Sequence, residues 1–83
     1  MILDENWAVD PGRVRDFFAQ LPGAVETPEG FIIEDCRVTL IPVESSLFGK
    51  WPMKRTRILL DGPEAAVNDI YRKFFLRFLS AGG

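Results

Sequence analysis

Few residues of this 83-residue chain could carry out catalysis. Cys36 is the single cysteine, and the sequence has no histidine that could activate its thiol. Cys36 alternates with Val38 and Leu40 on the predicted inner face of a strand, where burial disfavours the reactive thiolate. Paired carboxylates occur at Asp4-Glu5 and Glu34-Asp35, but neighbours in a strand point to opposite faces and do not converge. The sequence therefore predicts no catalytic residue and a protein that is not an enzyme.

Composition also restricts cofactors and location. A single cysteine without histidine excludes the usual zinc ligand sets and any disulfide within the chain. No calcium-binding loop motif is present, so we expect neither a metal nor a cofactor, and no small-molecule substrate is evident. No apolar run approaches the roughly 20 residues that span a bilayer, and Met1-Ile2-Leu3 leads directly into acidic residues instead of a signal segment. We expect a cytoplasmic protein that does not contact membranes.

The segment Lys50–Arg57 carries four bases and no acid. On a strand, Trp51, Met53, Arg55 and Arg57 would share one face. An aromatic side chain beside arginines can stack on a base while the arginines hold phosphate. The alternative function is therefore anion or single-stranded nucleic-acid binding, through Lys50, Trp51, Lys54, Arg55 and Arg57.

Two other interpretations of this segment remain open. Tryptophan, methionine and arginine are also enriched at protein interfaces. The arginines could instead form cross-strand pairs with Glu34, Asp35 or Glu44. The sequence pI of about 5.0 counts against strong non-specific nucleic-acid binding, which depends on neutralising phosphates.

The sequence ends in Gly82-Gly83. The ubiquitin-like sulfur carriers are similar in size and end in the same pair, so the chain resembles them in these residues. The resemblance implies a carboxylate that is adenylated and then thiolated, on a tail where a side chain would clash in a narrow channel. That family places its helix mid-chain between hairpins. In this chain the helical patterns occur instead near both ends of the predicted series of helices and strands. Gly82 could instead end the last helix as a left-handed cap. The carrier function is a minor alternative.

Sequence patterns place these residues on a small number of elements. Asp10-Pro11-Gly12 predicts a helix start, and Pro22-Gly23 predicts its end. Between them, apolar residues recur at the spacing of one helix face: Val14, Phe17, Phe18 and Leu21. Strands are predicted at 31–33, 36–41 and 53–61, with a hairpin-like break between 27 and 36 and a possible extra strand at 2–9. Pro42 indicates a strand end or an edge, and 44–52 reads as a loop.

A last helix is predicted from about Pro63 to Ser80. Its apolar arc is wider than packing on one sheet requires, and Leu76 lies among basic residues on the side expected to face water. An uncovered apolar strip on a small protein usually marks an interface. The predicted interface consists of Phe75, Leu76 and Leu79, with a second patch at Phe48, Trp51 and Met53.

These patterns together predict a single α+β domain over residues 1–83. We expect two layers: an antiparallel sheet of three to four strands with two helices on one face, in the order α-β-β-β-α with a possible extra N-terminal strand. The predicted function is non-enzymatic protein interaction, as a homodimer or as a small subunit of an assembly.

Overall fold

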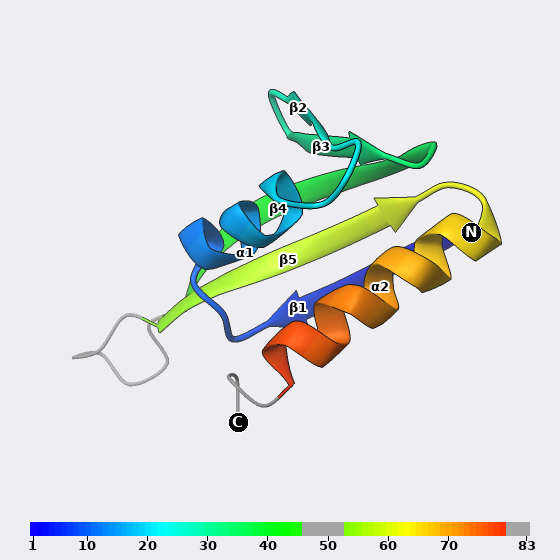
Figure 1. Ribbon diagram of the computed structural model, residues 1–83. Coiled ribbons are helices and arrows are strands. Elements are labelled where there is room, and N and C mark those ends of the chain that lie inside the picture. Colours follow the sequence, from blue (N-terminus) through cyan, green and yellow to red (C-terminus); the bar gives the residue numbers. More distant parts are fainter. Residues whose placement is uncertain (46–52, 80–83) are drawn as a thin grey trace.

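The computed structural model describes residues 1–45 and 53–79 and shows an antiparallel sheet with both helices on one face (Figure 1). The strands are β1 (Ile2–Trp7), β2 (Val25–Thr27), β3 (Gly30–Ile33), β4 (Cys36–Ser45) and β5 (Met53–Asp61). The helices are α1 (Pro11–Ala19) and α2 (Glu64–Phe78). The five strands lie in the order β1-β5-β4-β3-β2. The predicted α+β class and the extra N-terminal strand are confirmed.

The sheet has one strand more than the three to four predicted. β2 pairs with β3 in a tight hairpin, with Thr27 opposite Gly30 and Val25 opposite Ile32. A strand of three residues is too short to show an alternating pattern in the sequence. β2 forms one edge of the sheet, and β1 forms the other.

Both helix starts agree with their sequence signals. The Asp10 carboxylate accepts a hydrogen bond from the backbone N–H of Gly12 at 2.9 Å, and Pro11 occupies the first turn of α1. α2 begins at Glu64, directly after Pro63, and ends at Phe78 with Leu79 as its C-cap. The helix is thus slightly shorter than predicted. Gly82, the residue expected to cap it, lies outside the described residues.

Glu34-Asp35 forms the turn between β3 and β4. The φ angles are 51° for Glu34 and 64° for Asp35, so both residues are left-handed, as in a type I′ hairpin. This turn lies within the stretch 27–36, where the sequence predicted a hairpin-like break. The two carboxylates belong to an exposed turn instead of a catalytic pair.

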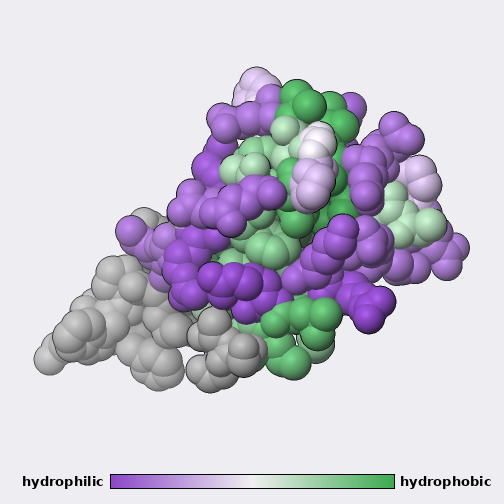
Figure 2. All heavy atoms as spheres, viewed as in Figure 1, coloured by the Kyte–Doolittle hydropathy of each residue, from purple (hydrophilic) through white to green (hydrophobic). Residues whose placement is uncertain are grey.

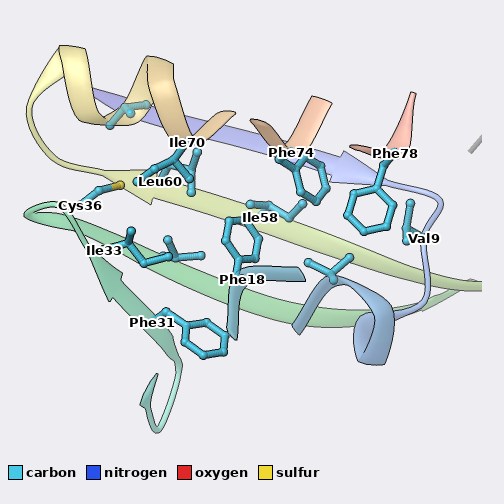
Figure 3. Close-up of a cluster of buried hydrophobic side chains, with 13 residues drawn as sticks. Val9, Phe18, Phe31, Ile33, Cys36, Ile58, Leu60, Ile70, Phe74 and Phe78 are labelled. Carbon is cyan, nitrogen blue, oxygen red and sulfur yellow. The ribbon is translucent and has the colours of Figure 1, made fainter. Parts of the chain in front are cut away.

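The core lies between the sheet and the two helices (Figure 3). The rings of Phe18 in α1 and Phe74 in α2 stack at 5.6 Å and 7°, joining the helices above the sheet. Ile58 and Leu60 of β5 are buried beneath them. Cys36 is buried as predicted, and burial raises the pKa of its thiol, which keeps the thiol protonated and unreactive near neutral pH.

Gly30 is predicted to tolerate no side chain. A Cβ there would collide with the carbonyl oxygen of Val38 and lie 2.9 Å from its carbonyl carbon. We expect Gly30→Ala to lower the free energy of unfolding by about 3 kcal/mol, since strand β4 has to move. At Gly23, where φ is 77° and no atom lies within 4 Å, alanine costs about 1 kcal/mol of backbone strain. Urea denaturation of both variants tests this. Equal losses would show that the close approach at Gly30 does not matter.

Candidate interaction surface

The C-terminal half of α2 lies beside the end of strand β1 (Figure 1). The buried face of α2 carries Val67, Ile70, Phe74 and Phe78. Trp7, the last residue of β1, packs edge-on against two rings of the helix, with centroid distances of 4.9 Å to Phe74 and 5.9 Å to Phe75. The side of α2 that carries Phe75 therefore faces outward over the β1 edge.

Three apolar side chains of this helix remain in contact with solvent. Their exposed fractions are 36% for Phe75, 64% for Leu76 and 54% for Leu79. We call these three residues the α2 strip. Figure 2 shows a hydrophobic group at the lower rim of this face, with hydrophilic side chains above it. The structure thus places the three helix residues of the predicted interface on one exposed surface.

The second predicted patch is not placed by the structure. Phe48 and Trp51 lie outside the described residues, as does Lys50 of the alternative anion site. Met53 begins β5 opposite Ser45, and its side chain is not described. The roles of these residues stay predictions.

Arg55 and Arg57 share the sheet face opposite the helices, as the alternation predicts, and both contact strand β1. Arg57 donates two hydrogen bonds to the carboxylate of Asp4, at 2.9 and 2.6 Å. The Nε of Arg55 donates to Asn6 at 2.9 Å. Both arginines thus pair with β1, the neighbour of β5, and the alternative pairing with Glu34 or Asp35 is not formed. The side chain of Glu44 lies outside the described part of the structure.

These contacts change the electrostatics of the predicted anion site. The hydrogen bond from Arg57 lowers the pKa of Asp4, and desolvation opposes it only in part. Each arginine donates to a β1 side chain, so part of its hydrogen-bonding capacity is already used. Lys54 is exposed. Anion or nucleic-acid binding stays a prediction.

Glu5 accepts two hydrogen bonds that the sequence did not reveal, one from within β1 and one from α2. Its carboxylate accepts from the indole N–H of Trp7 at 2.9 Å and from the hydroxyl of Tyr71 at 2.8 Å. Burial, and then the hydrogen bond and negative charge of Glu5, raise the pKa of Tyr71 to about 12. Alternation along β1 places Glu5 on the inner face, but no local pattern identifies a partner 66 residues away.

The described residues offer few signs of other chemistry. Residues 1–45 and 53–79 contain no cluster of side chains suited to holding a metal ion. None of the described helices is long and apolar enough to cross a membrane. A hollow of about 220 Å³ between the helices is lined by Arg13, Asp16 and Arg77, among others. The guanidinium groups of Arg13 and Arg77 lie 5.8 and 5.3 Å from the ring centre of Phe78.

Comparison with known proteins identifies one family. The family model described as "Archaeal MoaD-like protein" matches residues 8–83, nearly the whole chain. No curated protein and no solved structure matched the chain.

Tyr71 provides a direct test of the contact with Glu5. It is the one tyrosine of the chain, so absorbance near 295 nm follows its ionisation alone. We expect a transition at about pH 12 in the folded protein and near 10 after unfolding. Because the folded pKa is the higher one, the stabilisation is complete below pH 10 and is lost as pH rises through about 12.

The matched variant for this titration is Glu5→Gln. Its amide oxygen can still accept the hydrogen bond, but the negative charge is gone, so the tyrosine pKa falls toward 10 without reaching it. A wild-type titration near pH 10 in the folded state would contradict the contact.

Proposed function

Because the chain belongs to the archaeal MoaD-like family, we propose that it is a non-enzymatic domain that binds another protein through the α2 strip. The observation that supports this proposal most directly is the exposure of Phe75, Leu76 and Leu79 on one side of a helix whose other side is fully buried. Apolar side chains in such a position usually mark an interaction surface.

The energetics favour this use of the strip. Burying a Leu or Phe side chain contributes about 1.5 to 3 kcal/mol relative to leaving it exposed. Phe75 is already fixed by edge-on contact with Trp7, so it loses little side-chain freedom when a partner covers it. A rigid aromatic anchor beside flexible leucines is a typical composition for the centre of an interface.

The partner is either a second copy of the chain or another protein of an assembly. Both fit an apolar strip, and both were expected from the sequence. The second predicted patch, which consists of Phe48, Trp51 and Met53, would extend the surface if it faces the same partner.

A carrier function is the second candidate, and the family match favours it because the match includes Gly82-Gly83. Four residues follow Leu79, and they span at most about 14 Å when fully extended. If Gly83 bears the reactive carboxylate, an enzyme that modifies it must approach the C-terminal end of α2. Leu76 and Leu79 lie there, so the carrier candidate requires docking at the same strip.

The strip is tested by comparing two exposed apolar residues. Leu76→Asp places a charge in the α2 strip, and Val25→Asp places one on β2 at a similar exposure, 64% against 61%. Sedimentation at micromolar concentration should show a wild-type species heavier than 9.4 kDa. We expect Leu76→Asp to weaken this association at least about tenfold, because a carboxylate would be buried unpaired. Val25→Asp should leave it unchanged.

Other outcomes of this experiment are equally informative. A wild-type protein that is monomeric at all concentrations removes self-association. The same two variants then test affinity for a partner co-purified from the source cells. Equal behaviour of Leu76→Asp and Val25→Asp in both assays would contradict the role of the strip.

The carrier candidate is tested by intact mass. Incubation with ATP and an extract of the source cells should convert the terminal carboxylate to an acyl adenylate with release of pyrophosphate. A sulfur donor then displaces AMP and leaves a thiocarboxylate, in which sulfur replaces one oxygen. A chain lacking Gly83 is the control and should keep its mass. An unmodified wild-type chain would remove the carrier candidate and leave the interaction proposal standing.

A further inference from the structure

Strand β1 forms an open edge of the sheet. Met1 and Gly62 exchange two backbone hydrogen bonds, with the Met1 amino group donating at 2.9 Å and the Gly62 N–H donating at 3.1 Å. Bonded and non-bonded pairs alternate in an antiparallel ladder, so Leu3, Glu5 and Trp7 bond to β5. The backbone N–H and C=O groups of Ile2, Asp4 and Asn6 therefore point away from the sheet.

Two acids are the feature of this edge that discourages indiscriminate pairing: Asp4, and Glu5 on the inner face. β1 contains no proline, no lysine and no bulge, and its register against β5 is continuous over six residues, so the backbone itself is able to accept another strand. The opposite edge, β2, has three residues. Among the described strands, β1 thus offers the longer free edge, and the Phe75 side of α2 lies beside it.

The inner face of β1 defines what an added strand would meet. It carries Leu3, Glu5 and Trp7 in succession, an acid between two apolar residues. Glu5 is held by two neutral donors, and no lysine or arginine among the described residues forms an ion pair with it. A basic side chain directly opposite Glu5 would supply the missing charge at the close Cβ distance of a non-bonded pair.

A second copy of β1 fits this edge poorly. Outward-pointing residues must pair with outward-pointing residues, so a symmetric pairing is centred on Leu3, Asp4 or Glu5. The register centred on Leu3 leaves Asn6 and Trp7 without a partner, and the other two place Asp4 or Glu5 opposite its own copy. Like charges directly opposite each other are destabilising.

We infer that the β1 edge binds an extended segment of a partner protein with the inward pattern apolar-x-basic-x-apolar. The basic residue lies opposite Glu5, and the apolar residues lie opposite Leu3 and Trp7, the second one against Phe75. The pattern reads the same in both directions, so it serves a parallel or an antiparallel strand. The inference rests on the proposed function, since it assigns a kind of partner to an interaction domain.

The probes are the acetylated and amidated peptides TVTKTVT and TVTETVT. Nuclear magnetic resonance titration should show that the lysine peptide binds about tenfold more tightly than the glutamate peptide. The backbone N–H groups of Ile2, Asp4 and Asn6 should become protected from hydrogen exchange in the complex. Glu5→Gln should remove the preference for lysine while leaving the protection in place.

A proline variant tests the edge itself. Asp4→Pro removes one outward N–H that the free protein does not use, so the β1–β5 ladder is kept. Asp4→Ala is the matched control, because it loses the same contact with Arg57 but keeps the N–H. We expect Asp4→Pro to bind the lysine peptide at least about tenfold more weakly than Asp4→Ala.

Three results would overturn the inference: equal binding by Asp4→Pro and Asp4→Ala, unprotected amides in the complex, or no binding of either peptide at millimolar concentration. Leu76→Asp tests the α2 strip in the sedimentation assay, whereas Asp4→Pro tests the edge in the peptide assay. The inference can therefore fail while the proposed function stands, and the reverse also holds.

Discussion

The stacked rings of Phe18 and Phe74 determine how the rest of the structure is arranged. They join α1 to α2 over the same face of the sheet, with Phe17 filling the space between the helices at 5.7 Å from Phe74 and 5.6 Å from Phe78. Because α2 turns Phe74 toward α1, its opposite side is directed away from the core. Phe75 and Leu79 lie on that side and are exposed.

A second consequence of this arrangement appears at β1. Trp7 and Glu5 fasten the strand to α2, while Asp4 and Asn6 fasten it to the arginines of β5 on the other face. β1 is therefore held on both faces as well as by its ladder, although it lies at the edge of the sheet. An edge that is rigid and extended before a partner arrives loses little conformational entropy on pairing. The same contacts that stabilise β1 thus lower the entropic cost of the pairing proposed for it.

Local signals were sufficient to predict much of the fold. Asp10-Pro11 predicted the start of α1, the alternation at 53–61 predicted β5, and the last helix was placed within two residues at its C-terminal end. The alternation at 36–41 predicted only the first part of β4, which continues past Pro42 to Ser45, into the segment predicted as a loop. The turn at Glu34-Asp35 was left open because neither residue is a glycine or an asparagine, the usual residues for two left-handed positions. The Val25–Thr27 strand was too short to show the alternation of apolar and polar residues by which a strand is predicted.

Only part of the candidate site could be predicted from local sequence patterns. The exposure of Leu76 could be predicted, because a leucine among bases on the outer side of a helix is a local feature. The partners of Arg55, Arg57 and Glu5 could not, because they are 49, 53 and 66 residues distant along the chain. Which strand lies next to β5 is decided by packing of the whole sheet, and no charge pattern within one segment contains that information.

The position of α2 bears on how a carrier function could operate on this fold. The sulfur carriers that the Gly-Gly pair resembles place their helix mid-chain between hairpins, whereas every strand pair here is antiparallel and α2 is the last described element. Residues 80–83 therefore begin at the end of a helix whose outer side is apolar. A partner docked on Leu76 and Leu79, as proposed, would lie next to the four residues that follow Leu79. The interaction proposal and the carrier candidate therefore call for a partner at the same end of α2.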